Sequence, residues 1–128
     1  MNVLLDTVVF LWWVTDDRAL SAEAAALIRD SSRRVFLSPV SVWEIVVKHA
    51  LGKLPLPEDP ATLVPQLRKA HGFEELPLTE ASVLQLQRLP ALHRDPFDRM
   101  LLCQAIEHGL TLVTPDEDLR RYPVRTAW

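Results

Sequence analysis

Residues 34–52, RVFLSPVSVWEIVVKHALG, form one complete strand-to-helix unit and decide the class of fold. The run from Arg34 to Leu37 is apolar and rich in strand-favouring residues, so it predicts a buried strand. The dipeptide Ser38-Pro39 predicts a helix start, because serine caps helix N-termini and proline is accepted in the first helical turn. We expect this helix to continue to Leu51 and to end before Gly52.

The same alternation of strands and capped helices continues on both sides of this unit. The other predicted elements are a strand at Val3 to Leu5, a helix after Asp6 through Val14, a helix from Ser21 to about Asp30, a connector at Leu54 to Pro57, a helix from Asp59-Pro60 to Gly72, a short strand around Glu75 to Leu76, a Thr79-capped helix from about Glu80 to Leu89, a loop at Pro90 to Arg94, a helix from Asp95-Pro96 to Gly109, a strand at Thr111 to Thr114 and an edge strand at Val124 to Thr126. Such alternation is typical of an α/β fold, a mostly parallel central sheet with helices on both faces.

The composition fits a single domain over residues 1–128. Hydrophobic residues make up 48% of the chain and charged residues 24%, which excludes disorder as the main state. Cys103 is the sole cysteine, so no internal disulfide can form, as is typical of a reducing compartment. The longest apolar run, Val8 to Val14, is too short to span a membrane. We therefore expect a cytoplasmic protein without a membrane segment or a signal peptide.

Four acidic side chains are expected at one edge of the sheet. Asp6 and Asp116 each follow a predicted strand at its carboxyl end, where open α/β sheets bind their ligands. Asp98 lies in the first turn of its helix, and Glu44 lies about a turn and a half into the helix after the second strand. Crowded carboxylates repel one another and raise each other's pKa, so such a cluster normally holds a cation or a shared proton.

Oxygen ligands of this kind favour a hard cation. Mg²⁺ or Mn²⁺ suits carboxylates better than Zn²⁺, for which the sequence has no cysteine and histidine spacing. Such an ion activates water and stabilises charge on a phosphodiester during displacement. The acidic residues therefore predict metal-dependent hydrolysis of phosphodiester bonds.

The net charge of −3 argues against an overtly cationic nucleic-acid binder. Setting the four site acids aside leaves 13 of the 17 acidic side chains against 14 basic ones, of which eleven are arginines. Arginine is the basic side chain better shaped for phosphate contacts. The remaining surface can therefore approach a nucleic-acid backbone once a metal ion offsets the site acids, and nucleic acid should bind weakly without metal.

Several blocks of the sequence together resemble a PIN domain of the VapC type, the toxins of bacterial and archaeal toxin–antitoxin pairs. The blocks are Leu4-Leu5-Asp6-Thr7, Leu11-Trp12-Trp13, Ser41-Val42-Trp43-Glu44-Ile45, His93-Arg94-Asp95-Pro96-Phe97-Asp98-Arg99 and Leu112-Val113-Thr114-Pro115-Asp116. Their order and spacing extend the resemblance over nearly the whole chain.

The resemblance implies an endoribonuclease that depends on Mg²⁺ or Mn²⁺, is inhibited by a small cognate antitoxin and is usually a homodimer. Asp6, Glu44, Asp98 and Asp116 match the family's acidic positions, which assigns them to metal binding and catalysis. Pro115 stands before the fourth acid, where many relatives have another residue.

Other residues near the expected crevice have two interpretations. Thr7, Arg99 and Thr114 are candidate substrate contacts, whereas capping by the threonines or an ion pair between Arg99 and Asp95 would be structural. Asp95 precedes a proline at a helix start, so it is expected to cap that helix, with a secondary role at the site as the second interpretation.

Glu44 and the tryptophans can also be explained structurally. Glu44 can pair with Lys48 at i,i+4 on one helix face. Trp12, Trp13 and Trp43 are expected in the core, although the adjacent pair points to different helix faces, so that one member can face a partner chain.

Three further functions compete with a nuclease toxin. A receiver-type signalling module has a similar length, but it requires paired acids after the first strand and a late lysine, whereas Thr7 follows Asp6 here and the last lysine is Lys69. The second is a PIN fold that binds RNA or a partner without cutting, and the third is an RNA-processing nuclease without an antitoxin. A small neighbouring reading frame with a DNA-binding N-terminus would favour the toxin.

Overall fold

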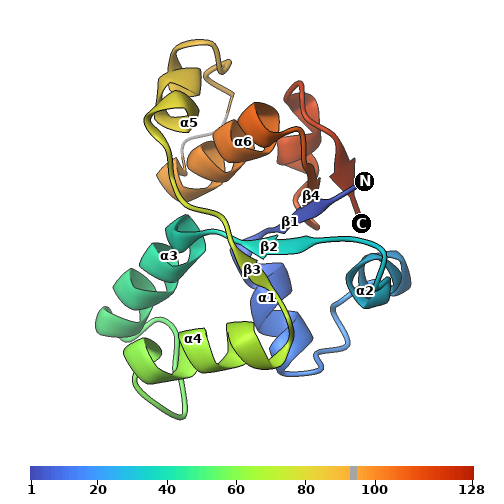
Figure 1. Cartoon of the computed structure of the whole chain (residues 1–128). Helices are drawn as coiled ribbons and strands as arrows, with labels where there is room; N and C mark the ends of the chain where they lie inside the picture. The colour runs from blue at the N-terminus through green and yellow to red at the C-terminus, as the bar shows by residue number, and fades with distance from the viewer. Residues whose placement is uncertain (93–94) are drawn as a thin grey trace.

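Five parallel strands form one sheet within the part of the chain that the structure describes, residues 1–92 and 95–128 of a computed structural model (Figure 1). The strands are β1 (Val3–Leu5), β2 (Val35–Leu37), β3 (Glu74–Glu75), β4 (Thr111–Val113) and β5 (Thr126–Ala127). Their order across the sheet is β3-β2-β1-β4-β5, and each neighbouring pair is parallel. The predicted α/β class is confirmed.

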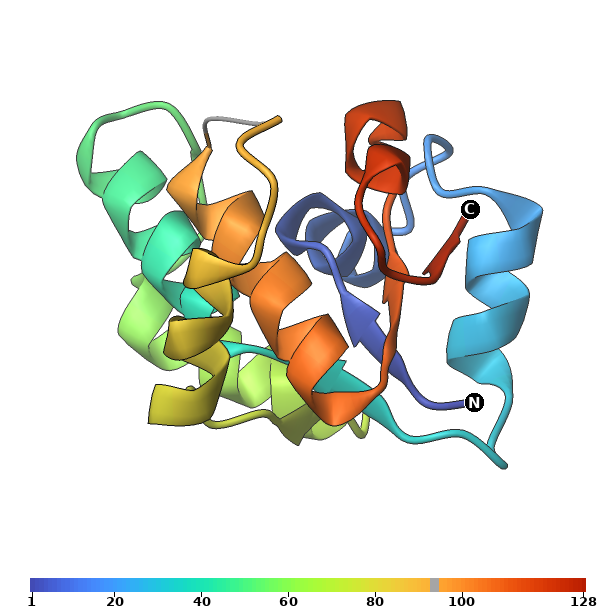
Figure 2. The same ribbon diagram turned by 90° about the horizontal axis from the view of Figure 1, so that it is seen from above.

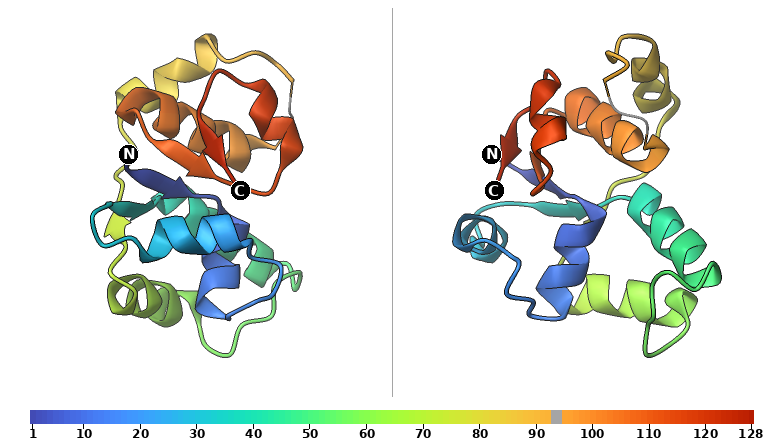
Figure 3. Two further views of the ribbon diagram at one scale, coloured as in Figure 1. Left: turned by 90° about the vertical axis from the view of Figure 1, so that its right-hand side faces the viewer. Right: turned by 180° about the vertical axis from the view of Figure 1, so that it is seen from behind.

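Helices cover both faces of this sheet. They are α1 (Thr7–Val14), α2 (Ala22–Arg29), α3 (Pro39–Ala50), α4 (Pro60–Ala70), α5 (Glu80–Leu84) and α6 (Pro96–His108), with 3-10 turns η1 (Gln85–Gln87) and η2 (Glu117–Arg121). Figure 1 shows α5 and α6 above the strands and α1, α2 and α4 below them. In the view from above, α6 lies across the sheet (Figure 2), and the side and rear views show the same division (Figure 3).

The alternation of side chains along β1 builds two hydrophobic cores. Leu4 packs into the core beneath α6, whereas Val3 and Leu5 point into the core formed with α1, α2 and α4. All three side chains are fully buried. A central parallel strand with both faces covered is expected to be uniformly apolar, and β1 is.

The helices that were predicted to start at a capping side chain each begin directly after that residue. Ser21, Ser38, Asp59, Thr79 and Asp95 each accept a hydrogen bond from a backbone N–H in the first turn of α2, α3, α4, α5 and α6, respectively. Gly109 ends α6 with a φ of 64°, a left-handed conformation that glycine adopts without steric cost.

Three predicted boundaries are wrong in detail. The helix expected from Glu80 to Leu89 ends at Leu84 and tightens into η1, where the N–H groups of Arg88 and Leu89 donate to the carbonyl oxygens three residues earlier. The edge strand begins at Thr126 rather than Val124, since its pairing starts where the Leu112 N–H donates to Arg125 O at 2.8 Å. The short third strand is Glu74–Glu75 rather than Glu75 to Leu76. The last two residues of the predicted loop, His93 and Arg94, lie outside the described residues.

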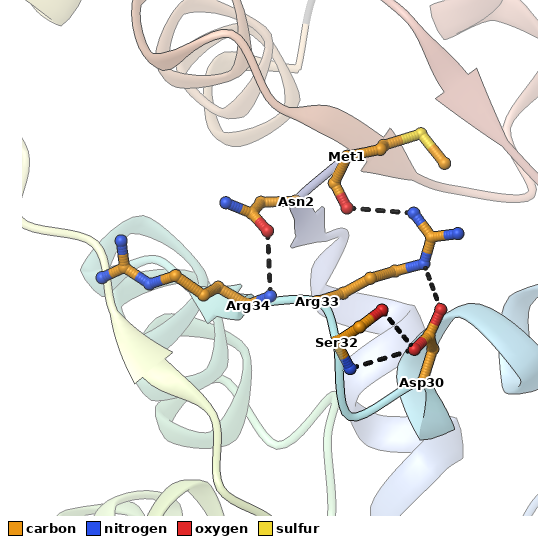
Figure 4. A network of polar contacts seen from close by, with 6 residues as sticks. All are labelled: Met1, Asn2, Asp30, Ser32, Arg33 and Arg34. Carbon is orange, nitrogen blue, oxygen red and sulfur yellow. Dashed lines mark hydrogen bonds and ion pairs between the residues drawn. The ribbon is translucent and has the colours of Figure 1, made fainter.

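A polar network fixes the start of β1 against the turn that leads into β2 (Figure 4). The Arg34 N–H donates to Asn2 Oδ1, and Arg33 Nη1 donates to Met1 O, each at 3.0 Å. Asp30 anchors the turn, because its carboxylate accepts from Ser32 and pairs with Arg33. These contacts hold β1 and β2 in register, with Val3 opposite Val35.

The strand order identifies where a ligand site can form. The chain leaves β1 toward β2 and β3 and later returns to the other side of β1 as β4, so the direction of winding reverses between β1 and β4. Open α/β sheets bind ligands at the carboxyl ends of strands at such a switch point. The order also differs from the 2-1-3-4-5 order of receiver-type folds, which excludes a signalling module of that type.

Two further sequence expectations can be compared with the fold. No helix in the described part of the chain is long and apolar enough to cross a membrane. The expectation that Trp43 lies in the core is wrong, because its side chain is 55% exposed and rests edge-on against Phe97 with ring centroids 4.7 Å apart. Trp12 and Trp13 are partly buried, and Cys103 is buried.

Candidate active site

Asp6 lies at the switch point between β1 and β4. Its backbone N–H donates to Val113 O at 3.0 Å, which continues the β1–β4 pairing to the first residue of the crevice. Its carboxylate accepts a hydrogen bond from the Thr114 hydroxyl at 2.7 Å. The side chain is buried. Its carboxylate is oriented by Thr114, the residue that follows the neighbouring strand β4.

The pKa of Asp6 is raised from 3.8 to about 6. Burial is the largest cause, because removal from water disfavours the charged form. The negative charges of Glu44 and Asp116 raise the pKa further, whereas the hydrogen bond from Thr114 lowers it. Three of the four predicted acids therefore share one electrostatic environment, although they come from β1, α3 and the end of β4.

Thr114 connects two of these acids through one hydroxyl. Its Oγ1 donates to Asp6 and also accepts from the Asp116 N–H at 3.1 Å. Asp116 in turn caps η2, since its carboxylate accepts from the Asp118 N–H at 2.9 Å. The structure thus gives Thr114 an orienting role at the centre of the site.

Glu44 is buried in α3 and pairs with Lys48 one turn later. Only 5% of the Glu44 residue surface is exposed. Its Oε2 atom forms an ion pair with Lys48 Nζ, and its Oε1 atom is buried with no hydrogen-bond partner in the part of the chain that the structure describes. The i,i+4 pairing suggested by the sequence is confirmed, and it uses one of the two carboxylate oxygens.

Lys48 links Glu44 to the acids at the start of α6. The hydrogen bond to Glu44 is the largest cause that raises the pKa of Lys48, and the charges of Glu44, Asp95 and Asp98 raise it further. The N-terminal turn of α6 therefore lies close enough to α3 for all three carboxylates to act on one ammonium group.

Asp95 is the N-cap of α6, as predicted. Its Oδ1 atom accepts from the N–H groups of Phe97 at 2.8 Å and Asp98 at 3.1 Å. Asp98 is in the first turn and half-buried, so its carboxylate is near the positive end of the helix dipole. The two acids are thus divided between a capping position and a position inside the helix.

The remaining predicted substrate contacts have structural partners. The Thr7 hydroxyl donates to Ser41 Oγ at 2.9 Å in a buried bond that joins α1 to α3. Arg99 Nη1 donates to Pro90 O at 3.0 Å and so ties α6 to the preceding loop. Ser41 was not singled out from the sequence, because nothing in its local pattern indicates a partner 34 residues away.

A pocket of about 250 Å³ opens beside Glu44. Its polar rim includes Thr7, Lys48 and Lys53, and its apolar lining comes from α1, α3 and Leu54. Lys53 reaches this position because the chain reverses after α3, where the Lys53 N–H donates to Lys48 O at 2.9 Å. The sequence contains the signal for this reversal in Gly52, whose φ is 73°.

The four acidic side chains lie near one another, but they do not converge on a single metal-binding point. Among residues 1–92 and 95–128, no three histidine, cysteine, aspartate or glutamate side chains form a group that could hold a metal ion. Asp6, Glu44 and Asp116 instead each interact with a different partner: the Thr114 hydroxyl, the Lys48 ammonium and the Asp118 N–H, respectively. The ligand atoms nevertheless fit a hard cation, because all are oxygens and Glu44 Oε1 has no partner among the described residues. The pKa of Asp6 is raised mainly by burial and further by the charges of Glu44 and Asp116, and a bound cation would offset both effects.

Comparisons with known proteins give a consistent result. The family model described as PIN domain matches residues 3–125. Ribonuclease VapC22 of Mycobacterium tuberculosis is 29% identical over 122 residues, which cover 94% of this chain and 92% of that protein. Ribonuclease VapC16 of the same organism is 37% identical over 59 residues, which cover 46% of this chain and 42% of that protein.

Solved structures share the fold at low sequence identity. VapBC2 from Rickettsia felis, bound to a DNA fragment from its promoter, matches with a TM-score of 0.75 at 15% identity and covers 100% of this chain and 99% of its own. FitAcB from Neisseria gonorrhoeae matches with a TM-score of 0.61 at 18% identity and covers 97% and 95%, respectively. At such identities the likeness demonstrates the fold.

Proposed function

The chain belongs to the PIN domain family, and from that premise we propose that it is a metal-dependent endoribonuclease, the VapC-type toxin of a type II toxin–antitoxin pair. The observation that carries the proposal is the setting of Asp6. Its carboxylate is buried at the switch point of the sheet, oriented by Thr114 and flanked by the charges of Glu44 and Asp116. Carboxylates crowded in a buried position lower the stability of the fold, and such groups are typical of functional sites. The relatives named ribonucleases support the same reaction.

Asp6, Glu44, Asp98 and Asp116 are the residues that would hold the metal ion. Mg²⁺ is the ion that we assign to them, with Mn²⁺ as the second candidate, because both prefer carboxylate oxygens. When bound, the ion supplies positive charge that stabilises a phosphodiester under attack and makes water more acidic.

The chain's own residues orient and position the reactants. Thr114 fixes the Asp6 carboxylate and the backbone after β4 together. Arg99 follows Asp98 on α6, and its guanidinium suits the bidentate contact that RNA phosphates offer, so we assign it to substrate binding together with Thr7 and Thr114. Asp95 orders the first turn of α6 and thereby places Asp98.

We further propose an antitoxin partner, a homodimeric assembly and a cytoplasmic location. VapBC-5 from Mycobacterium tuberculosis, which shares the fold with a TM-score of 0.58, is a member of the VapBC family of toxin–antitoxin systems, which supports a small antitoxin as the partner of this chain. Co-expression with the neighbouring small gene tests this point. Withholding that gene should arrest growth and generate new RNA ends, and growth arrest without new ends would contradict the nuclease.

The decisive experiment compares RNA cleavage by the purified wild type and by Asp6→Asn. We expect cleavage in Mg²⁺ or Mn²⁺ and a loss on the order of 100-fold or more in the variant, because one ligand position loses its charge. Asp118→Asn is the matched control: Asp118 is exposed next to Asp116 and should leave cleavage near the wild-type rate. Equal cleavage by wild type and Asp6→Asn would contradict the assignment, and RNA binding without cleavage in any metal would favour a binding module.

A further inference from the structure

Lys48 places a positive charge among the carboxylates of the candidate site. We propose that this lysine is a resident counter-ion that competes with the divalent metal ion for Glu44 and so sets the metal concentration at which the site fills. The inference rests on the proposed function, because it takes Glu44 as a metal ligand. It goes further in assigning a role to a basic residue that is not itself a ligand.

The first step is the cost of burying Glu44. An ionised carboxylate removed from water is destabilising unless a cation or several hydrogen-bond donors accompany it. For Glu44 the accompanying cation is Lys48, which is placed one helical turn away on the same face of α3. The pair therefore supplies the accompanying cation, and within residues 1–92 and 95–128 it leaves Oε1 without a partner.

The second step is that the Lys48 ammonium serves more than one acid. The carboxylates of Asp95 and Asp98 act on it in addition to Glu44. Glu44 and Asp98 are two of the four residues assigned to the metal ion. Because a lysine ammonium and a divalent cation repel each other at short range, both cannot occupy the region between these carboxylates.

The third step is that Lys48 can leave without disturbing α3. Its side chain is 45% exposed and lines the pocket beside Glu44, which offers space for the ammonium. The four-carbon stem is flexible, and the charge can move into water by rotation about side-chain bonds alone. The ion pair is therefore exchangeable, and Lys48 stays beside Glu44 until a stronger cation displaces it.

The test is Mn²⁺ binding, measured by titration calorimetry on the full chain without RNA. We expect Lys48→Met to bind Mn²⁺ on the order of tenfold more tightly than the wild type, because a competing charge is gone. Lys48→Arg keeps the charge and should bind within about twofold of the wild type. Lys53→Met is the matched control: it removes a charge from the same pocket, but Glu44 forms its ion pair with Lys48, so the effect at Lys53 should be smaller.

Each outcome separates this inference from the proposed function. Wild-type protein that binds no Mn²⁺ would overturn the metal-dependent nuclease and the inference together. Wild-type protein that binds Mn²⁺, with Lys48→Met equal or weaker, would overturn the inference alone. An equal gain for Lys48→Met and Lys48→Arg would also overturn it, since the arginine variant retains the positive charge. An equal gain for Lys48→Met and Lys53→Met would overturn it too, by showing a general charge effect in place of competition at Glu44.

Discussion

The burial of the Asp6 carboxylate destabilises the folded protein when this side chain is charged. This carboxylate is buried at the carboxyl end of β1, and its pKa of about 6 means that the charged form is disfavoured there. A shift from 3.8 to about 6 corresponds to about 3 kcal/mol of stability lost at neutral pH. Between pH 3.8 and about pH 6, Asp6 of the folded protein holds a proton that the unfolded chain has released. The free energy of unfolding therefore falls as the pH rises through this interval.

Asp6→Asn should therefore stabilise the metal-free protein. The amide oxygen can still accept the hydrogen bond from Thr114, while the buried charge is removed. At about pH 7.5 we expect a gain of about 1–3 kcal/mol, which raises the melting temperature by several degrees. Thermal unfolding in the presence of a chelator measures this gain.

The pH dependence provides the control. The advantage of Asp6→Asn should shrink as the pH falls from about 6 towards about 4, because the wild-type carboxyl is then neutral as well. Added Mn²⁺ should raise the melting temperature of the wild type and not that of the variant. A wild type that melts above Asp6→Asn at neutral pH without metal would contradict the burial cost.

At the scale of one element, α6 depends on its cap. Asp95 satisfies two N–H groups at the start of this 13-residue helix, and the same turn carries Asp98. Asp95→Ala should cost about 1 kcal/mol, whereas Asp95→Asn keeps an oxygen acceptor and should cost a few tenths at most. Chemical denaturation of both variants measures the difference.

Cleavage by Asp95→Asn then distinguishes a cap from a secondary role at the site. If Asp95 only orders the helix, the amide variant should cleave RNA at close to the wild-type rate. A clear loss of cleavage at unchanged stability would show that the charge of Asp95 itself acts at the site, through Lys48 or directly.

The elements also show how far the sequence could predict the structure. Helix starts at Ser38 and Asp95 were predictable because a cap and a following proline act locally. The early end of α5 was not, since its apolar spacing suits an α-helix and gives no sign of the i,i+3 bonds that tighten the chain after Leu84. The exposure of Trp43 could not be predicted from hydrophobicity alone, because burial depends on which helices pack around a side chain.

The site was predictable in part. Because strands that end at a switch point bring their following residues together, the neighbourhood of Asp6 and Asp116 followed from topology. The bond between Thr7 and Ser41 depends on the packing of α1 against α3, which has no local signature. The turn that brings Lys53 to the pocket has a local signal in Gly52, but the pocket itself depends on that same packing. The assignment of the acids as ligands stays a prediction.

At the scale of the whole molecule, the balance of charge should make RNA binding depend on metal. The chain carries a net charge of −3, and the candidate site concentrates negative charge where RNA would approach. At matched ionic strength, we expect RNA to bind on the order of tenfold more weakly in a chelator than in Ca²⁺, which occupies oxygen sites. Fluorescence polarisation with a labelled oligonucleotide measures the affinities. Equal binding in both conditions would show that RNA docks away from the acids.

The pairing of β1 with β4 has a consequence for how the protein is made. Asp6 and the donor that orients it are 108 residues apart, so a ribosome releases the acid early and its partner only near the end of synthesis. Until then β1 lacks the neighbour that covers one of its edges. A half-made chain therefore holds no assembled site. A stop codon anywhere before Thr111 should likewise yield a fragment without activity.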